Sequence, residues 1–246
     1  MPVSSKLFIF FLLFFINYNA TATVKNGSQN DIVKVISSDW RPYVYQENNQ
    51  FKGSSYDILT QVFNQANLQF DLKIMPWARV YSYGLTKKNQ LILGLGRTPQ
   101  RENLFHWIGP VDKGVKAYFF RLKTNAINIT KLDDVKNYRV GIQRRSYNHE
   151  FMIAHSFEKN LQLTVTPVQL IKMLIKNRLD LVLIPEKEMS EIIKNRQLDP
   201  NLVEKVFFAF KVVDYMAFSK TTSQTLIRKV TTAYQALNFE GKINLH

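Results

Sequence analysis

Short apolar runs alternate with amphipathic segments along most of the chain, and this alternation limits the fold more than any other feature of the sequence. Residues 31–37, 69–75 and 91–95 have the length and composition of strands. Between them lie two segments with apolar residues at helical spacing, one beginning at Gly53-Ser54-Ser55 and one at residues 78–88. Strands that alternate with helices are typical of α/β proteins with mostly parallel sheets, so we predict this fold class.

The same pattern is repeated after Gly109-Pro110. Four more strands are predicted at residues 116–122, 139–143, 161–166 and 179–184, and they alternate with helices at 130–135, 146–159, 168–177 and 186–195. The run at 179–184 is apolar throughout, as in a strand that is covered on both faces. The chain therefore contains two α/β units in succession.

The last part of the chain is expected to return to the first unit. Residues 206–210 and 215–219 have the pattern of strands, and the final helix carries one apolar stripe. About 30 residues cannot form a domain with a core of its own. We therefore predict two lobes with a cleft between them: residues 31–111 with 216–246, and residues 116–211, joined by hinges near 111–115 and 211–215.

The first 22 residues have the pattern of a secretory signal peptide. Lys6 precedes ten apolar residues from Leu7 to Ile16, and the small residues Ala20-Thr21-Ala22 follow as a cleavage site. Ten apolar residues fall short of the roughly 18 that a membrane span requires. The sequence has no cysteine, so neither disulfides nor a lipid on cysteine are available to it. We expect a monomer in the periplasm of a Gram-negative bacterium.

The charge balance is strongly basic. Lys and Arg number 33 against 19 Asp and Glu, which gives a formal net charge of +14 and an attraction for anions. The basic residues are scattered and match no nucleic-acid-binding motif, so no nucleic-acid partner is expected. His149 and His155 are not at the four-residue spacing that places two metal ligands on one helix face. No metal or other cofactor is expected.

The segment from Trp77 to Arg101 carries the strongest functional signal. An apolar strand ends in Gly94 and Gly96, the pair Thr98-Pro99 can open a helix, and Arg101 follows one turn later. Free backbone N–H groups, a hydroxyl and a guanidinium can converge there on one anion. The pattern predicts a receptor for a carboxylate-like group.

Taken in order, these motifs resemble the type 2 periplasmic solute-binding proteins of family 3, which bind polar amino acids for ABC importers. The segment Gly94 to Glu102 is similar to that family's Gly-x-Thr-x-Thr-x-x-Arg. Supporting motifs are Trp40-Arg41-Pro42-Tyr43, Gly53-Ser54-Ser55-Tyr56-Asp57, Asn177-Arg178-Leu179-Asp180 and Ala217-Phe218-Ser219-Lys220. The resemblance covers residues 31–245. It implies a two-lobed clamp with two hinge strands that closes around a small solute, and an ABC permease as the membrane partner.

The resemblance implies binding roles for particular residues of the first lobe. Arg101 matches the arginine that grips the ligand's carboxylate, and Thr98 matches a hydroxyl partner on the same loop. Trp40 and Trp77 match the aromatic positions that enclose the ligand. Gly94 matches a glycine whose carbonyl group faces the ligand.

In the second lobe, residues 141–147 match a ligand-contacting loop and make Gln143, Arg145 and Ser146 candidates, with Ser146 able to cap the next helix. The family's ammonium-binding carboxylate falls at Pro185, which cannot accept a salt bridge. The residues that could replace it are Glu186, Glu188, Asp39 and Asp214.

The arginines add an expectation about charge. Arg97, Arg144 and Arg145 are expected beside Arg101, and such a group favours a solute with more than one negative charge. The expected class is a binding protein and not an enzyme. Two alternatives stay open: an orphan sensor or accessory protein for signalling, and a dehydratase on the same fold that uses Glu150, His149 or Glu186 as acid–base groups.

Overall fold

The structure is a computed structural model that describes Met1 and residues 32–246. The predicted signal peptide falls on residues that lie outside this description. Within the described residues, no helix is both long enough and apolar enough to cross a membrane.

The first sheet has five strands in the order β4-β1-β5-β12-β6. Four strands share one direction, because β1 pairs in parallel with β4 and β5, and β12 opposes both of its neighbours. The strands are β1 (Val33–Ser37), β4 (Phe70–Ile74), β5 (Gln90–Gly96), β6 (Phe105–Pro110) and β12 (Asp214–Ser219). This sheet and its helices are called the first lobe below.

Three helices cover this sheet: α1 (Ser54–Gln65), α2 (Trp77–Thr86) and α6 (Gln224–Phe239). Successive residues of a strand point to opposite faces. Leu91 and Leu93 therefore pack in the core formed with α1 and α6, whereas Ile92 packs in the core formed with α2. The apolar runs of the sequence thus form strands that are buried on both faces.

The second sheet repeats this plan in the order β11-β7-β10-β8-β9. Strands β10, β8 and β9 are parallel, and β7 runs antiparallel to β10 and β11. The strands are β7 (Val115–Leu122), β8 (Val140–Gln143), β9 (Leu161–Thr164), β10 (Leu181–Pro185) and β11 (Val203–Val212). This sheet and its helices are called the second lobe.

The helices of the second lobe are α3 (Tyr147–Ala154), α4 (Pro167–Ile175) and α5 (Glu186–Asn195). Apolar residues of α4 and α5 form one core with Phe120, and Met152 of α3 shares another with Phe119. Thr166 and Gln169 form a capping box at the start of α4, which satisfies backbone N–H groups that the helix leaves free.

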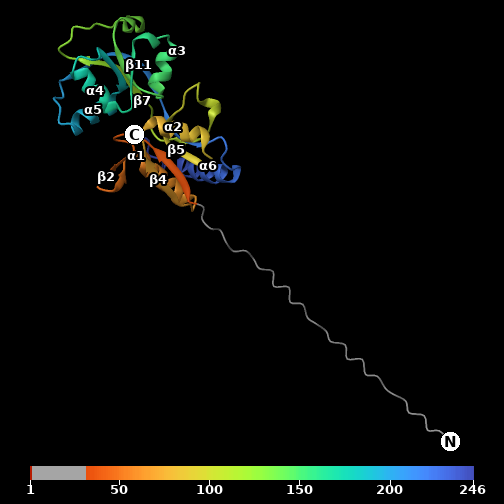
Figure 1. Ribbon diagram of the computed structural model, residues 1–246. Helices are drawn as coiled ribbons and strands as arrows, with labels where there is room; N and C mark the ends of the chain where they lie inside the picture. Colours follow the sequence, from red (N-terminus) through yellow and green to blue (C-terminus); the bar gives the residue numbers. More distant parts are fainter. Residues whose placement is uncertain (2–31) are drawn as a thin grey trace.

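The α/β class and the two-sheet architecture are confirmed. Figure 1 shows the second lobe above the first, and the chain crosses from one sheet to the other between β6 and β7 and again between β11 and β12. The predicted lobe boundaries and hinge positions stay predictions.

Several local expectations were wrong. Thr98-Pro99 opens no α-helix; a turn follows, and then a single 3-10 turn at Glu102–Leu104. The helix predicted at 146–159 ends at Ala154, since Ser156 takes a left-handed backbone with φ of 60°. The helix predicted at 130–135 is a 3-10 helix at Leu132–Asn137. The hairpin of β2 (Tyr45–Glu47) and β3 (Gln50–Lys52), and strand β6, were not predicted.

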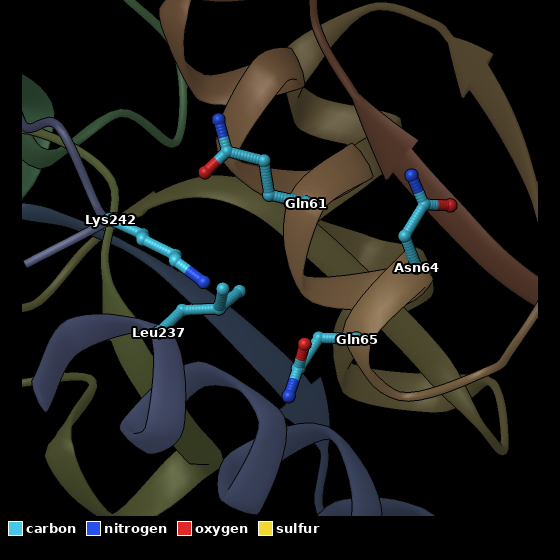
Figure 2. Close-up of a pocket in the computed structure, with 5 residues that line it drawn as sticks. All are labelled: Gln61, Asn64, Gln65, Leu237 and Lys242. Carbon is cyan, nitrogen blue, oxygen red and sulfur yellow. The ribbon is translucent and has the colours of Figure 1, made fainter. Parts of the chain in front are cut away.

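A groove of about 590 Å³ lies between α1 and α6 on the first lobe (Figure 2). Three amide side chains, a leucine and a lysine line it: Gln61, Asn64, Gln65, Leu237 and Lys242. It contains none of the predicted ligand-binding residues.

Candidate functional site

A small cavity of about 40 Å³ lies between the two lobes. This volume is enough for one water molecule or one ammonium group. Both lobes contribute to its walls, which are formed by Ser38, Asp39, Trp40, Trp77, Gly94, Gln143, Ser146, Tyr147, Asn148, Pro185, Glu188 and Asp214. A wider groove of about 880 Å³ shares Asp39, Trp77, Gln143 and Glu188 with it, so the cavity is the inner end of a larger interlobe space.

The strands explain why these residues meet. Strands β1, β4, β8 and β10 all end at this cavity, and the loops or helices that follow them supply its walls. Carboxyl ends of parallel strands are where open α/β sheets bind ligands. The first lobe contributes both tryptophans in this way, and the second lobe contributes Gln143 and Pro185.

Gly94 has a structural requirement of its own. Its φ of 82° lies in the left-handed region, and a Cβ placed there would be 3.2 Å from the ring of Trp40. A glycine therefore allows the indole ring of Trp40 to lie against strand β5.

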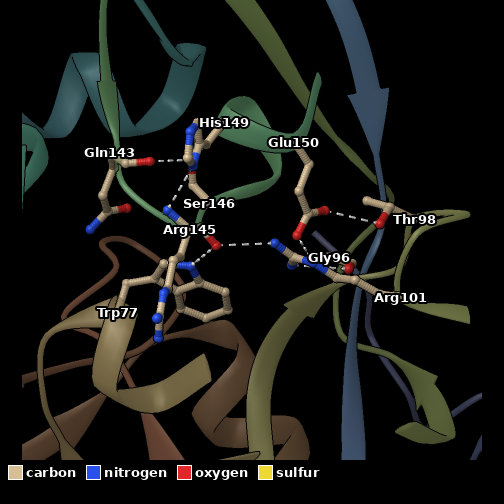
Figure 3. Close-up of polar contacts among 9 residues, drawn as sticks. All are labelled: Trp77, Gly96, Thr98, Arg101, Gln143, Arg145, Ser146, His149 and Glu150. Atoms are coloured by element: carbon tan, nitrogen blue, oxygen red, sulfur yellow. Dashed lines mark hydrogen bonds and ion pairs between the residues drawn. The ribbon is translucent and has the colours of Figure 1, made fainter. Parts of the chain in front are cut away.

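Arg101 is buried, with 0% of its surface exposed. Its Nε donates to Glu150 Oε1 at 2.8 Å, and its Nη1 and Nη2 donate at 3.3 Å to the carbonyl oxygens of Gly96 and Arg145 (Figure 3). The guanidinium carbon lies 5.6 Å from the ring centre of Trp77 and 4.8 Å from that of Tyr81. Arg101 lines neither interlobe space, because these partners surround it.

Two further hydrogen bonds join the lobes beside Arg101. Thr98 Oγ1 donates to Glu150 Oε2 at 3.2 Å, and Trp77 Nε1 donates to the Arg145 carbonyl oxygen at 2.7 Å (Figure 3). The Glu150 carboxylate thus accepts hydrogen bonds from a hydroxyl and a guanidinium of the same first-lobe loop. This is the pair of groups predicted to hold a carboxylate.

The second-lobe loop is shaped by Arg145 and Ser146. Arg145 has a left-handed backbone with φ of 60°, and its carbonyl oxygen accepts hydrogen bonds from both Trp77 and Arg101. Ser146 caps α3, since its Oγ accepts from the backbone N–H of His149 at 3.2 Å and donates to the Gln143 carbonyl oxygen at 2.7 Å.

Acidic side chains also line the cavity. Asp214 is 1% exposed and lies beside the Asp112 carboxyl group; apart from that acid, no group of the described residues hydrogen-bonds to its carboxylate oxygens. Burial and the neighbouring Asp112 carboxylate raise the pKa of Asp214 well above its usual range. Burial, and then the charge of Asp39, raise the pKa of Glu188 to about 8. Within residues 32–246 no cluster of three or more acids and histidines has the arrangement of a metal site.

The predicted residues divide into three groups. Trp40, Trp77, Gly94, Gln143 and Ser146 line the cavity. The structure places Arg101, Thr98 and Arg145 together in the network next to it. Glu186 lies apart, because its carboxylate pairs with Lys205 at 2.5 Å, and Glu188 lines the cavity in its place.

Arg97 does not join Arg101 in the predicted group of four arginines. Arg97 pairs with Glu102 at 2.5 Å and lies over the rings of Trp107 and Tyr215. The Arg145 carbonyl oxygen accepts a hydrogen bond from Arg101, which is also paired with Glu150. The expectation of a solute with several negative charges therefore loses part of its basis.

Sequence reasoning missed Tyr147 and Asn148. The Tyr147 ring packs so closely on the first lobe that a Cβ at Gly96 would lie 2.6 Å from it. Asn148 donates to the Leu183 carbonyl oxygen at 3.1 Å, while its own Oδ1 is buried without a partner among the described residues. The sequence feature that could have indicated Tyr147 is Gly96. It stands where the resembled family has a threonine, and it leaves room for a large ring.

Comparison with known proteins identifies the family. The chain matches the model of the bacterial extracellular solute-binding proteins, family 3, over residues 32–245, and it belongs to that family. A comparison with curated proteins found no match.

Three solved structures illustrate the fold. A histidine kinase sensor domain similar to periplasmic binding proteins has 16% identity and a TM-score of 0.78, over 87% of this chain and 93% of that one. The arginine-, lysine-, histidine-binding protein ArtJ of Geobacillus stearothermophilus has 19% identity and a TM-score of 0.73, over 86% and 91%. The substrate-binding protein AbpA of Streptococcus pneumoniae, solved with L-arginine, has 19% identity and a TM-score of 0.69, over 86% and 90%.

Proposed function

We propose that this protein is a periplasmic receptor that captures a small amino-acid-like solute, bearing a carboxylate, between its lobes and delivers it to a membrane partner such as an ABC permease. In this proposal, residues 1–22 direct export, the mature protein acts as a monomer, and it performs no covalent chemistry. Membership of a family of solute-binding proteins supports the receptor role.

One observation carries the proposal. The guanidinium of Arg101 is buried between the lobes, stacked near two aromatic rings and already bound to a carboxylate, that of Glu150. Burial makes an arginine–carboxylate interaction strong because little water competes for either group. We infer that a solute carboxylate takes this position when the solute is bound.

The acids that line the cavity support a positive group on the same solute. Asp214, Glu188 and Asp39 line the cavity, and apart from the neighbouring Asp112 the two carboxylate oxygens of Asp214 lack hydrogen-bond donors among the described residues. A buried acceptor without a donor costs free energy that an ammonium group would recover. A zwitterionic or basic amino acid fits this lining better than a dicarboxylate, and two of the three structures compared above are described with such ligands.

A thermal-shift screen of the mature protein tests the proposal. A ligand at 100 times its dissociation constant adds about 2.7 kcal/mol of stability, which is a clear shift of the melting temperature. We expect amino acids with a free carboxylate and a free ammonium group to stabilise the protein. Stabilisation only by dicarboxylates, or by amines without a carboxylate, would contradict the proposal.

Solute sensing is a second candidate function, and the fold similarity to a histidine kinase sensor domain favours it. Transport and sensing use the same cleft and differ in the membrane partner. Deleting the gene distinguishes them once the solute is known: loss of solute uptake supports transport, whereas normal uptake with loss of the transcriptional response to the solute supports sensing.

A further inference from the structure

Beside Arg101 the two lobes are joined directly, because Arg101, Thr98 and Trp77 of the first lobe donate hydrogen bonds to Glu150 and Arg145 of the second. Glu150, in the first turn of α3, presents one carboxylate oxygen to Arg101 and the other to Thr98 (Figure 3). These two first-lobe groups are the ones assigned above to a solute carboxylate. A side chain of the protein therefore occupies the position that the solute is proposed to take.

This ion pair differs from the others in the molecule. The remaining ion pairs among residues 32–246 join residues of the same lobe, and many are well exposed. The pair of Arg101 and Glu150 joins opposite lobes, and its side chains are 0% and 20% exposed. Exposed pairs contribute little, whereas breaking a buried pair leaves an uncompensated charge.

We propose that Glu150 is an internal competitor of the solute: with Arg101 and Thr98 it forms a latch that holds the empty protein closed. This inference rests on the proposed function, because it assigns the competing carboxylate to the solute. Opening the lobes separates Glu150 from Arg101 and exposes the guanidinium to the solute. The solute binds only the open form, so the latch lowers the apparent affinity by the fraction of molecules that are open.

The charge of Glu150 is the element to change. Glu150→Gln keeps the size of the side chain and removes the charge, which leaves Arg101 without a counter-ion in the closed form and favours opening. Glu102→Gln is the matched control, because Glu102 pairs with Arg97 on the first lobe only. Glu150→Asp is a second variant, which keeps the charge but shortens the reach of the carboxylate.

Small-angle X-ray scattering of the solute-free proteins tests the latch without any ligand. We expect a compact wild type and Glu102→Gln variant, a larger radius of gyration for Glu150→Gln, and an intermediate value for Glu150→Asp. Circular dichroism confirms that each variant is folded. Equal radii for folded wild type and both Glu150 variants would overturn the proposal.

Calorimetry with the solute found by the screen supplies the second readout. We expect Glu150→Gln to bind about tenfold more tightly than wild type, as when about a tenth of the free wild-type protein is open. Weaker binding by Glu150→Gln would show that Glu150 helps to hold the solute, and would overturn its role as a competitor. If no carboxylate-bearing solute binds any variant, the proposed function fails, while the scattering data still decide whether Glu150 closes the lobes.

Discussion

Two buried charged groups of the interlobe site, Arg101 and Asp214, differ in how their charge is compensated. Arg101 is fully buried, and Glu150 and two backbone carbonyl groups compensate its charge. Asp214 is equally buried, but apart from the Asp112 carboxyl group its oxygens find no donor among the described residues, and burial raises the pKa of Asp214. The protein therefore provides a counter-ion for Arg101, whereas the hydrogen-bond partner of Asp214 is another acid.

This difference indicates how the site is used. A compensated charge resists opening, because each partner loses the other when the lobes separate. An uncompensated acid destabilises the empty protein until a proton or a cation binds. A solute with a carboxylate and an ammonium group would replace Glu150 at Arg101 and provide a donor for the acids that line the cavity.

The largest effect on solute binding is expected from the loss of Arg101. Arg101→Ala removes the proposed carboxylate partner and should cost about 2 to 5 kcal/mol of solute binding free energy, as for truncation of one member of a desolvated charged pair. Isothermal titration calorimetry measures the loss. Arg97→Ala is the control, since Arg97 pairs with Glu102 outside the cavity and its loss should leave binding nearly unchanged.

The next effect concerns Glu188 and pH. Its pKa is about 8 in the folded protein, above the usual value of 4.5, so the folded state holds the proton more tightly than the unfolded state. The contribution to stability is complete below about pH 4.5 and is lost as the pH rises to about 8. Glu188→Gln should remove this dependence and stabilise the empty protein at pH 8 by roughly 2 to 4 kcal/mol. Urea unfolding at pH 5 and pH 8 measures it, and a wild type equally stable at both would contradict the account.

Asp214→Asn sharpens the comparison by neutralising the second buried acid. The empty variant should be more stable than wild type at pH 7, because an isosteric amide neither buries a charge nor has to take up a proton on folding. Binding of an ammonium-bearing solute should weaken by about 1 to 3 kcal/mol, since a charge-assisted hydrogen bond is lost. Melting curves and titrations on the same samples check both changes. Stronger binding by the variant would argue against an ammonium group at Asp214.

The smallest effect is expected for the unfolding free energy on changing Ser146, in the loop before α3. Ser146→Ala removes the cap of α3 and should cost about 0.5 to 2 kcal/mol of unfolding free energy. Ser223→Ala, at the cap of α6 far from the cleft, is the comparison. Because Ser146 also lines the cavity, a loss of solute affinity with Ser146→Ala alone would indicate that Ser146 contributes to binding, by contact or by fixing α3.

The order of the strands and helices could be predicted from the sequence because apolar periodicity directly records burial on one or both faces. The run Leu181–Pro185 shows this. It is apolar and buried, and its alternate residues pack into two different hydrophobic cores on the two faces of the sheet. The positions of Trp40 and Trp77 at the cavity could also be predicted, because each follows a strand that ends there, whereas Arg101 lies next to the cavity and not in its lining. Strand β6 was missed because it begins with the three ring residues Phe105, His106 and Trp107 and ends in Gly109-Pro110, without clear alternation of apolar and polar residues.

The partners of the site residues could not be predicted. Glu150 meets Arg101 across 49 positions of sequence and across two lobes, and no local pattern records such a contact. Glu186 and Glu188 looked equivalent beside Pro185. Their roles differ because Lys205 of β11 reaches Glu186, whereas Glu188 lines the cavity.

The central claim is that one solute places a carboxylate at Arg101 and an ammonium group beside the acids that line the cavity. Calorimetric titration of the wild-type protein with three versions of the best ligand tests it most directly: the free amino acid, its carboxamide and its N-acetyl derivative. We predict that the free amino acid binds and that each derivative loses at least about tenfold in affinity, or about 1.4 kcal/mol. Equal binding of the carboxamide would contradict the role of Arg101, and equal binding of the N-acetyl derivative would contradict the role of the acids.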